Sequence, residues 1–214
     1  MICGVDEAGR GPVLGPLIIC GIAVKSDKAL RQLKVRDSKK LTPKRREELA
    51  PKIMRLAQVE LVEISADQID SLRTRMTMNE LEAKVFAAIV ERLSPEIAYL
   101  DAADVDEDNF GKSVMKSLSC ATRIVSEHKA DDTYPVVSAA SIVAKVNRDR
   151  RVREIEREIG RPIGSGYLTD DVTVAFLEEW IRENGCCPPH TRQSWEPAQN
   201  LMRLKDVRRL DQFE

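Results

Sequence analysis

The chain has 214 residues, of which 43% are hydrophobic and 32% are charged, and its formal net charge is −1. Charged residues are spread along the whole length, which excludes a disordered or fibrous chain and predicts one globular domain with a small appendage. A charge this close to zero does not by itself indicate a nucleic-acid partner, so that evidence has to come from local clusters of basic residues.

No segment of the chain has the composition of a membrane span. The longest apolar stretch, VLGPLIICGIAV, is short and is interrupted by Gly15, Pro16 and Gly21. The first residues lead directly to Asp6 and Glu7, without the basic and apolar regions of a secretory signal. The five cysteines are scattered and include no Cys-x-x-Cys pair, which favours reduced thiols over disulfides or a zinc site. We therefore expect a cytoplasmic protein that does not contact a membrane.

Segments with the period of a strand alternate along the chain with segments that have the period of a helix. Strands are expected at residues 2–5, 17–24, 59–64, 97–100 and 123–126, and helices at residues 43–56, 78–93, 109–118, 136–159 and 171–184. The turn AGRGPVLGP is too short for a parallel crossover, so the first two strands should form an antiparallel hairpin. The later strands are interleaved with helices, which predicts an α/β fold with a mixed sheet, followed by a helical C-terminal third.

Acidic residues follow apolar strands at three places. Asp6 and Glu7 end the first strand, Asp101 ends the strand in IAYLDAAD, and Asp131 and Asp132 follow the strand RIVSEH. Successive side chains of a strand point to opposite faces, so the first two acids converge only if the strand twists or bulges. Carboxylates brought together repel one another and need a cation, and oxygen ligands without histidine favour Mg²⁺ or Mn²⁺. For each acid alone, the alternative is a residue that forms the turn at a strand end.

Two clusters of basic and polar residues indicate phosphate binding. The segment RDSKKLTPKRR carries Lys39, Lys40 and Arg46 just before and within a predicted helix. In SAASIVAKVNRDRR, Ser141 and Lys145 are four residues apart and share one helical face. Together with the acids, these clusters suggest metal-dependent hydrolysis of a phosphodiester. The alternative is a solvated helix face, since charge runs are common on protein surfaces.

Six motifs resemble, in their order and spacing, the type 2 ribonucleases H, also called ribonuclease HII: DEAGRGPVLGPL, DSKKLT, YLDA, HKAD, SAASIVAKVNRD and GSGYLTD. They span nearly the whole chain, and HKADDTYPVVSAAS looks closer to archaeal members than to bacterial ones. The resemblance implies a monomer with a ribonuclease H-like fold, a mixed sheet flanked by helices. It implies a catalytic domain over residues 1–160, with a helical extension over residues 161–214 that packs on it and ends in a flexible tail.

The resemblance also implies an activity. Members of the family hydrolyse the RNA strand of RNA/DNA hybrids, and we expect cleavage on the 5′ side of a single ribonucleotide embedded in duplex DNA, leaving a 3′-hydroxyl and a 5′-phosphate. The family's catalytic and metal-binding acids fall on Asp6, Glu7, Asp101 and Asp131, so that Asp132 is a neighbour and not a ligand. The expected cofactor is a pair of Mg²⁺ or Mn²⁺ ions.

Other positions that the resemblance assigns would bind the substrate. The family's glycine-arginine-glycine turn falls on Gly9, Arg10 and Gly11, where small residues let the backbone approach a ribose 2′-hydroxyl. Its tyrosine falls on Tyr167 and would stack on the sugar beside the scissile phosphate, the alternative being a core tyrosine. The positions that hold phosphates in the family fall on Lys39, Lys40, Arg46, Ser141 and Lys145.

The last residues, VRRLDQFE, resemble a degenerate peptide that binds a sliding clamp. Leu210 and Phe213 have the spacing of its hydrophobic anchors, but Val207 stands where glutamine is usual. The alternative is a frayed terminus.

Two other functions stay open. A DNA-specific nuclease or resolvase on the same general fold would cut an all-DNA duplex as well as a hybrid, and the glycine-arginine-glycine turn argues against it. A non-catalytic nucleic-acid-binding subunit would gain nothing from clustered carboxylates near phosphates, so the four acids argue against that function.

Overall fold

The computed structural model describes residues 1–35, 41–104 and 106–210, and of residues 204–210 it describes only the course of the helix. The chain forms two compact units. Unit 1 comprises Met1–Ala8, Ile18–Glu63 and Met76–Asn147, and unit 2 comprises Gly9–Leu17, Ile64–Arg75 and the described part of Arg148–Glu214. Unit 2 differs from the expected extension over residues 161–214, because it also includes the turn after the first strand, a segment from the middle of the chain and half of a long helix.

Unit 1 is built on a mixed sheet with the strand order β3-β2-β1-β4-β5. β1 pairs antiparallel with β2 and parallel with β4, and β4 pairs parallel with β5. This arrangement confirms the predicted fold class and the predicted hairpin. The strands are β1 (Ile2–Ala8), β2 (Leu17–Val24), β3 (Gln58–Ile64), β4 (Ile97–Asp101) and β5 (Arg123–Glu127).

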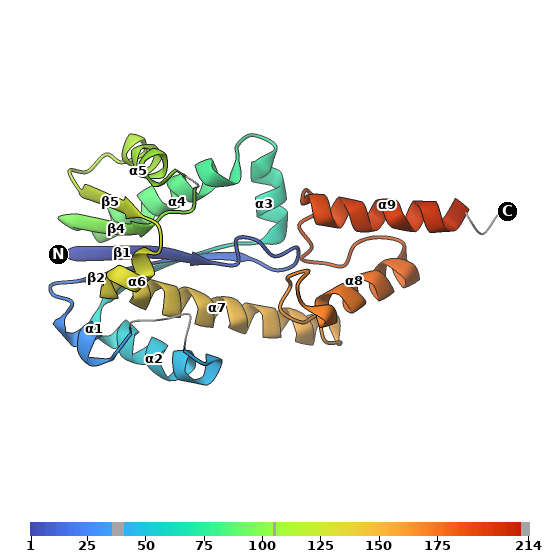
Figure 1. The fold of residues 1–214 in the computed structure, drawn as a ribbon, viewed down its shortest axis with the longest axis horizontal. Helices are drawn as coiled ribbons and strands as arrows, with labels where there is room; N and C mark the ends of the chain where they lie inside the picture. The colour runs from blue at the N-terminus through green and yellow to red at the C-terminus, as the bar shows by residue number, and fades with distance from the viewer. Residues whose placement is uncertain (36–40, 105, 211–214) are drawn as a thin grey trace. The chain divides into compact units, whose positions relative to one another are not determined.

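Helices cover both faces of this sheet, as Figure 1 shows. One face carries α1 (Lys28–Gln32), α2 (Pro43–Leu56) and the N-terminal part of α7 (Pro135–Ile159), and the other carries α4 (Met78–Leu93) and α5 (Glu107–Lys116). The helix starts follow from local chemistry. α2 begins where Thr42 accepts a hydrogen bond from the backbone N–H of Arg45, and α4 begins with a capping box between Thr77 and Glu80. A short helix, α6 (Ala130–Thr133), follows β5 almost directly.

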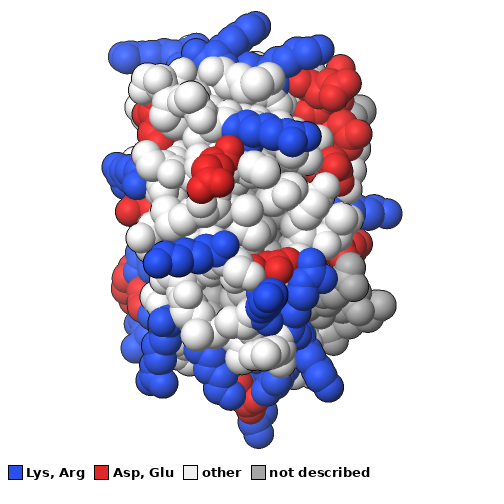
Figure 2. All heavy atoms as spheres, turned by 90° about the vertical axis from the view of Figure 1, so that its left-hand side faces the viewer, with Lys and Arg blue, Asp and Glu red and all other residues white. Residues whose placement is uncertain are grey.

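The face on which β1 begins is drawn in Figure 2, and its charge is mixed. Lys and Arg side chains lie mostly around the rim of this view, Asp and Glu side chains lie among them, and much of the centre is uncharged. The described residues drawn in this view therefore carry charges of both signs.

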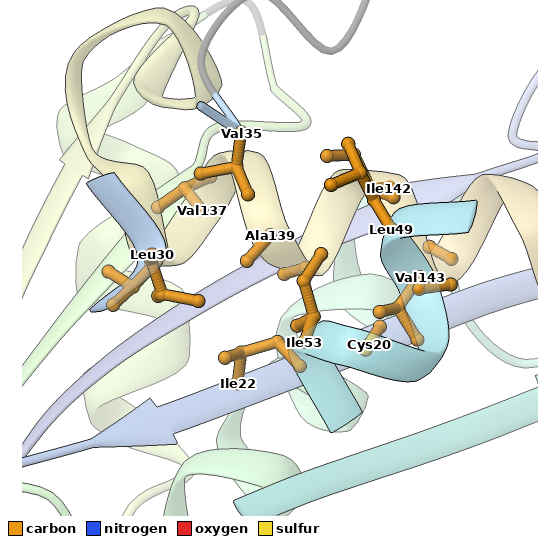
Figure 3. Close-up of a cluster of buried hydrophobic side chains, with 14 of the residues drawn as sticks. Cys20, Ile22, Leu30, Val35, Leu49, Ile53, Val137, Ala139, Ile142 and Val143 are labelled. Atoms are coloured by element: carbon orange, nitrogen blue, oxygen red, sulfur yellow. The ribbon is translucent and has the colours of Figure 1, made fainter. Parts of the chain in front are cut away.

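One core cluster of unit 1 lies between β2 and the helices α1, α2 and α7 (Figure 3). Every residue of β2 is buried, and the N-terminal half of α7 contributes an almost continuous apolar surface. Each fully buried aliphatic side chain stabilises the fold by about 1.5 to 3 kcal/mol. The residues labelled in Figure 3 are Cys20, Ile22, Leu30, Val35, Leu49, Ile53, Val137, Ala139, Ile142 and Val143.

A close backbone contact at Gly4 holds β1 against α7. A Cβ atom at this position would lie 2.6 Å from the carbonyl oxygen of Val136. We expect Gly4→Ala to separate strand and helix and to lower the free energy of unfolding by about 3 kcal/mol, because the obstacle is backbone that cannot rotate away. Denaturant titration measures the loss.

The matched control for this substitution is Gly160→Ala. A methyl group there would meet no atom within 4 Å, and only the φ of 79° opposes the change. Equal losses of stability in the two variants would contradict the role assigned to Gly4.

Unit 2 has a core of its own. Its helices are α3 (Ala66–Arg73), α8 (Asp171–Asn184), α9 (Glu196–Leu210) and the C-terminal half of α7. Val13 and Leu14, from the turn after β1, belong to this core, so the turn is packed and is not a free loop. The other buried members are Val152, Ile155, Ile163, Phe176, Leu177 and Ala198. No helix in the described part of the chain combines the length and the apolar character that a membrane span needs.

Candidate active site

Two of the four predicted acids meet at the carboxyl ends of β1 and β4. These strands run parallel with Val5 opposite Leu100, so Asp6 and Asp101 follow at the same level. Asp6 is only 4% exposed. Burial, and then repulsion from the carboxylate of Asp101, raise the pKa of Asp6 to about 7. The predicted meeting of these two carboxylates is therefore present in the structure.

The carboxylate of Asp6 is held by its neighbours in unit 1. The backbone N–H of Glu7 donates to Asp6 Oδ1 at 2.7 Å, the hydroxyl of Ser141 donates to the same carboxylate, and the ammonium of Lys145 attracts it. Lys145 Nζ also donates to Ser141 Oγ. Ser141 is completely buried, so in this structure its hydroxyl supports Asp6 and does not reach the surface, where the predicted phosphate contact would be.

The start of α6 contacts the acid pair through Asp101. The backbone N–H of Ala130 donates to Asp101 Oδ1 at 3.0 Å, which ties the end of β4 to this helix. Asp131, the next residue, is only 1% exposed, whereas Asp132 is exposed. The hydroxyl of Ser138 donates to the backbone carbonyl of Asp131. Burial next to the group that holds Asp101 favours Asp131 over Asp132 as a member of the site.

The part that Glu7 plays in the site stays a prediction. β1 pairs with β2 without interruption from Ile2 to Ala8, so the strand has no bulge at Glu7, and only its twist could bring this carboxylate toward that of Asp6. Among the described residues, no three His, Cys, Asp or Glu side chains stand ready to hold a metal ion. The four-acid ligand set thus stays a prediction. The chemistry of the pair nevertheless fits a hard divalent cation, which would relieve the crowding of a buried carboxylate with its neighbour.

The predicted turn and Tyr167 lie together in unit 2. Gly9 has a φ of 85°, and a Cβ atom there would lie 2.5 Å from the carbonyl oxygen of Pro16, so only glycine fits. A Cβ atom at Gly11 would lie 3.7 Å from a ring carbon of Tyr167. The ring of Tyr167 is half-buried and lies 5.0 Å from the guanidinium of Arg148, which stacks on it. Tyr167 is therefore a neighbour of the turn and not a core tyrosine.

The predicted basic residues do not all lie at the acid pair in the described part of the chain. Lys39 and Lys40 lie outside the described residues. Arg46 lies in the first turn of α2, is half-buried, and donates from Nη1 to the carbonyl oxygen of Leu41 at 2.8 Å. Lys145 is half-buried beside Asp6. Of the two basic residues that the structure describes, Lys145 is thus placed at the acid pair.

Two buried arginines of unit 2 were missed by the sequence analysis. Arg148 is 6% exposed and donates to the carbonyl oxygen of Ser165 at 2.5 Å, and Arg192 is completely buried. Arg148 stands in the quoted motif SAASIVAKVNRD, which was a usable signal. Arg192 stands in no motif that we considered, and no periodicity or charge run marks it.

The mixed sheet, the helices on both faces and the acid pair at adjacent parallel strand ends define a ribonuclease H-like hydrolase. The family model of ribonuclease HII matches residues 3–198. The chain belongs to the ribonuclease HII family, metal-dependent endoribonucleases that cleave the RNA of RNA/DNA hybrids. The resemblance seen in the six motifs is thereby confirmed.

Individual relatives agree over nearly the full length. Ribonuclease HII of Methanoregula boonei is 46% identical over 213 residues, covering 100% of both chains. Ribonuclease HII of Archaeoglobus fulgidus, solved as a complex with PCNA, gives a TM-score of 0.88 at 41% identity and covers 94% of this chain and 96% of that one. Ribonuclease H2 of Pyrococcus horikoshii gives a TM-score of 0.87 at 40% identity, covering 94% and 97%.

Proposed function

We propose that this chain cuts duplex DNA on the 5′ side of a single embedded ribonucleotide, as well as the RNA strand of a hybrid, and leaves a 3′-hydroxyl and a 5′-phosphate. The observation that carries the proposal is the pairing of Gly11 with the half-buried ring of Tyr167. A backbone without side chains can approach a 2′-hydroxyl, which DNA lacks, while an aromatic ring beside it can stack on the sugar. Together they would recognise one ribose without needing a long hybrid.

We assign metal binding and catalysis to Asp6, Glu7, Asp101 and Asp131. When bound, two Mg²⁺ or Mn²⁺ ions would supply an activated water and stabilise the leaving 3′-oxygen. The chain's own groups prepare the carboxylates. Ser141 and Lys145 orient Asp6, and the N–H of Ala130 orients Asp101.

We infer that Lys39, Lys40, Arg46 and Lys145 contact phosphates, which position a duplex without reading its sequence. In contrast to the initial expectation, Ser141 is assigned to Asp6 and not to a phosphate. The carboxyl ends of β1 and β4 lie at the opposite end of these strands from the face in Figure 2.

The test uses three end-labelled duplexes: DNA with one ribonucleotide, an RNA/DNA hybrid, and DNA alone. We expect cleavage of the first two in Mg²⁺ or Mn²⁺, none in EDTA, and products whose 3′ ends a polymerase can extend. Equal cutting of all three would identify a DNA-specific nuclease instead. Binding of all three without cutting would identify a non-catalytic subunit.

We further propose that the C-terminus binds a sliding clamp. The segment VRRLDQFE has the anchor spacing of a clamp-binding peptide, with Val207 in place of glutamine, and the similar Archaeoglobus fulgidus protein was solved as a complex with PCNA. The side chain of Leu210 and the whole of Phe213 lie outside the described residues.

Deleting residues 207–214 should weaken binding to a sliding clamp at least about tenfold in calorimetry, since both apolar anchors are lost. Cleavage of a short duplex without the clamp should be unchanged. The double variant Leu210→Ala and Phe213→Ala should reproduce the loss, and Asp211→Ala should not. If the truncated chain bound the clamp as well as the full chain does, the segment would be a frayed terminus and not a clamp-binding peptide.

A further inference from the structure

Arg192 is a completely buried arginine in unit 2, and its backbone is joined to the turn that follows β1. Thr191 forms an isolated bridge with Leu14, and the N–H of Arg192 donates to the carbonyl oxygen of Val13 at 2.8 Å. The segment that carries Arg192 is thus anchored to the turn before any side-chain contact is considered.

The guanidinium of Arg192 gathers backbone carbonyls from both ends of this turn. Nη1 donates to the carbonyl oxygen of Arg10 at 2.6 Å, and Nη2 donates to that of Gly9. Nε and Nη2 also donate to the carbonyl oxygen of Gly15, at 3.1 and 3.0 Å. One rigid planar fork therefore holds the two ends of the turn together, which the single ammonium of a lysine could not do.

Groups on α3 hold the segment that carries Arg192. The carboxylate of Asp70 accepts hydrogen bonds from the N–H of Ser194 at 3.1 Å and from its hydroxyl at 2.5 Å. The ring of Trp195 lies 4.5 Å from the guanidinium of Arg73 and 5.0 Å from that of Arg192. Arg73 is exposed, so its contact with the ring is weak, but its Nη1 also donates to the carbonyl oxygen of Ser194 at 3.3 Å, and α3 thus helps to keep the segment that carries Arg192 in place.

We propose that Arg192 is a positioning residue for ribose recognition, because it sets the backbone conformation of the turn at Gly9, Arg10 and Gly11. The inference rests on the proposed function, in which this turn contacts the 2′-hydroxyl. Removing the fork takes a donor from several backbone carbonyls at once, and a buried acceptor that loses its donor is costly. The turn then leaves its conformation, while the groups that hold Asp6 and Asp101 are unchanged.

The first measurement needs no substrate. In Arg192→Lys, amide hydrogen exchange in the peptide that covers residues 9–17 should rise at least about tenfold, with exchange in β4 unchanged. Asp70→Asn, which weakens the hold on the segment without touching the turn, should give a smaller rise in the same peptide. Unaltered exchange in residues 9–17 in both variants would overturn the proposal.

The second measurement compares duplexes with a ribonucleotide or a 2′-fluoro nucleotide at one position, by kcat/KM and by binding in Ca²⁺. Arg192→Lys should lose about 30-fold in kcat/KM on the ribonucleotide. Its preference for binding the ribonucleotide over the 2′-fluoro duplex should shrink, with metal affinity retained. A uniform loss on both duplexes, or a parallel loss of metal affinity, would make Arg192 merely structural and overturn the proposal.

The matched control is Arg161→Lys, an arginine of unit 2 that pairs with Glu183 at 3.1 Å on the surface. It should change neither readout. The proposed function and the role of Arg192 can be contradicted separately. A wild-type chain that cuts no ribonucleotide-containing duplex contradicts the proposed function. An active wild type with an equally selective Arg192→Lys variant contradicts only the role of Arg192.

Discussion

Asp101→Asn is expected to lower the rate of cleavage by at least about 10³-fold, a loss of roughly 4 kcal/mol in the stabilisation of the transition state. Asparagine keeps an oxygen that can accept the N–H of Ala130, now at 3.0 Å from Asp101 Oδ1, so the connection between β4 and α6 should survive. The variant loses only the negative charge, which the proposed metal binding requires. Single-turnover cleavage and Mn²⁺ calorimetry, with circular dichroism to verify folding, measure the effect.

Two neighbouring acids supply the controls for this experiment. Asp131→Asn should resemble Asp101→Asn, because Asp131 is buried next to the residue that holds Asp101. Asp132→Asn should stay close to wild type, because its side chain is exposed. Activity of Asp101→Asn within tenfold of wild type would remove Asp101 from the catalytic set, and a reversed result for the other two would exchange their roles.

The metal-free protein is expected to lose stability as the pH rises from about 4 to about 7. The ordinary pKa of an aspartate is 3.8, and burial with repulsion from Asp101 raises that of Asp6 to about 7 in the folded chain. The folded state therefore favours protonated Asp6. The stability that this preference contributes is fully present below pH 3.8 and is lost as the pH rises through the raised pKa of about 7. The loss is on the order of a few kcal/mol. Denaturant titrations in EDTA between pH 4 and 8 measure it.

Added Mn²⁺ should restore stability above pH 7, because it offsets the charge that the fold disfavours. Asp6→Asn should remove most of the pH dependence in this window. Asp170 changes the stability in the opposite direction, because hydrogen bonds from Ser165 lower its pKa and stability is then lost as the pH falls. This effect is confined to a pH below the ordinary pKa of an aspartate. Identical pH profiles for wild type and Asp6→Asn would show that Asp6 is not the group responsible.

Much of the secondary structure could be predicted because its signals are local. β2, α2, α4 and α8 have the predicted bounds, and the three helices begin at capping side chains that the sequence displays. The short helices α1 and α6 were missed because one or two turns carry no period. α3 was missed although Ser65 and Gln68 form a capping box, a signal that was available. β1 is longer than predicted, because two polar residues continue its ladder with β2.

The site was predictable only in part, for a physical reason. Acids at the ends of parallel strands meet at one edge of a sheet, so Asp6 and Asp101 could be paired from the sequence. The choice between Asp131 and Asp132 depends on burial, which no local pattern reveals. Arg192 bonds to backbone carbonyls 177 or more positions away in the chain, and carbonyls leave no mark in a sequence.

The hydrogen bonds to Arg192 orient the carbonyl groups of Gly9 and Arg10, and they thereby also orient the N–H groups of the same peptides. None of the described peptide bonds is cis, and in a trans peptide the C=O and the N–H point in opposite directions. The carbonyls of Gly9 and Arg10 point at the guanidinium, so the N–H groups of Arg10 and Gly11 point away from it. Two consecutive amide donors then point to the same side of the turn, an arrangement that can act as a receptor for an oxygen atom. Because main-chain amides make up this receptor, it would accept a sugar oxygen whatever base the nucleotide carries.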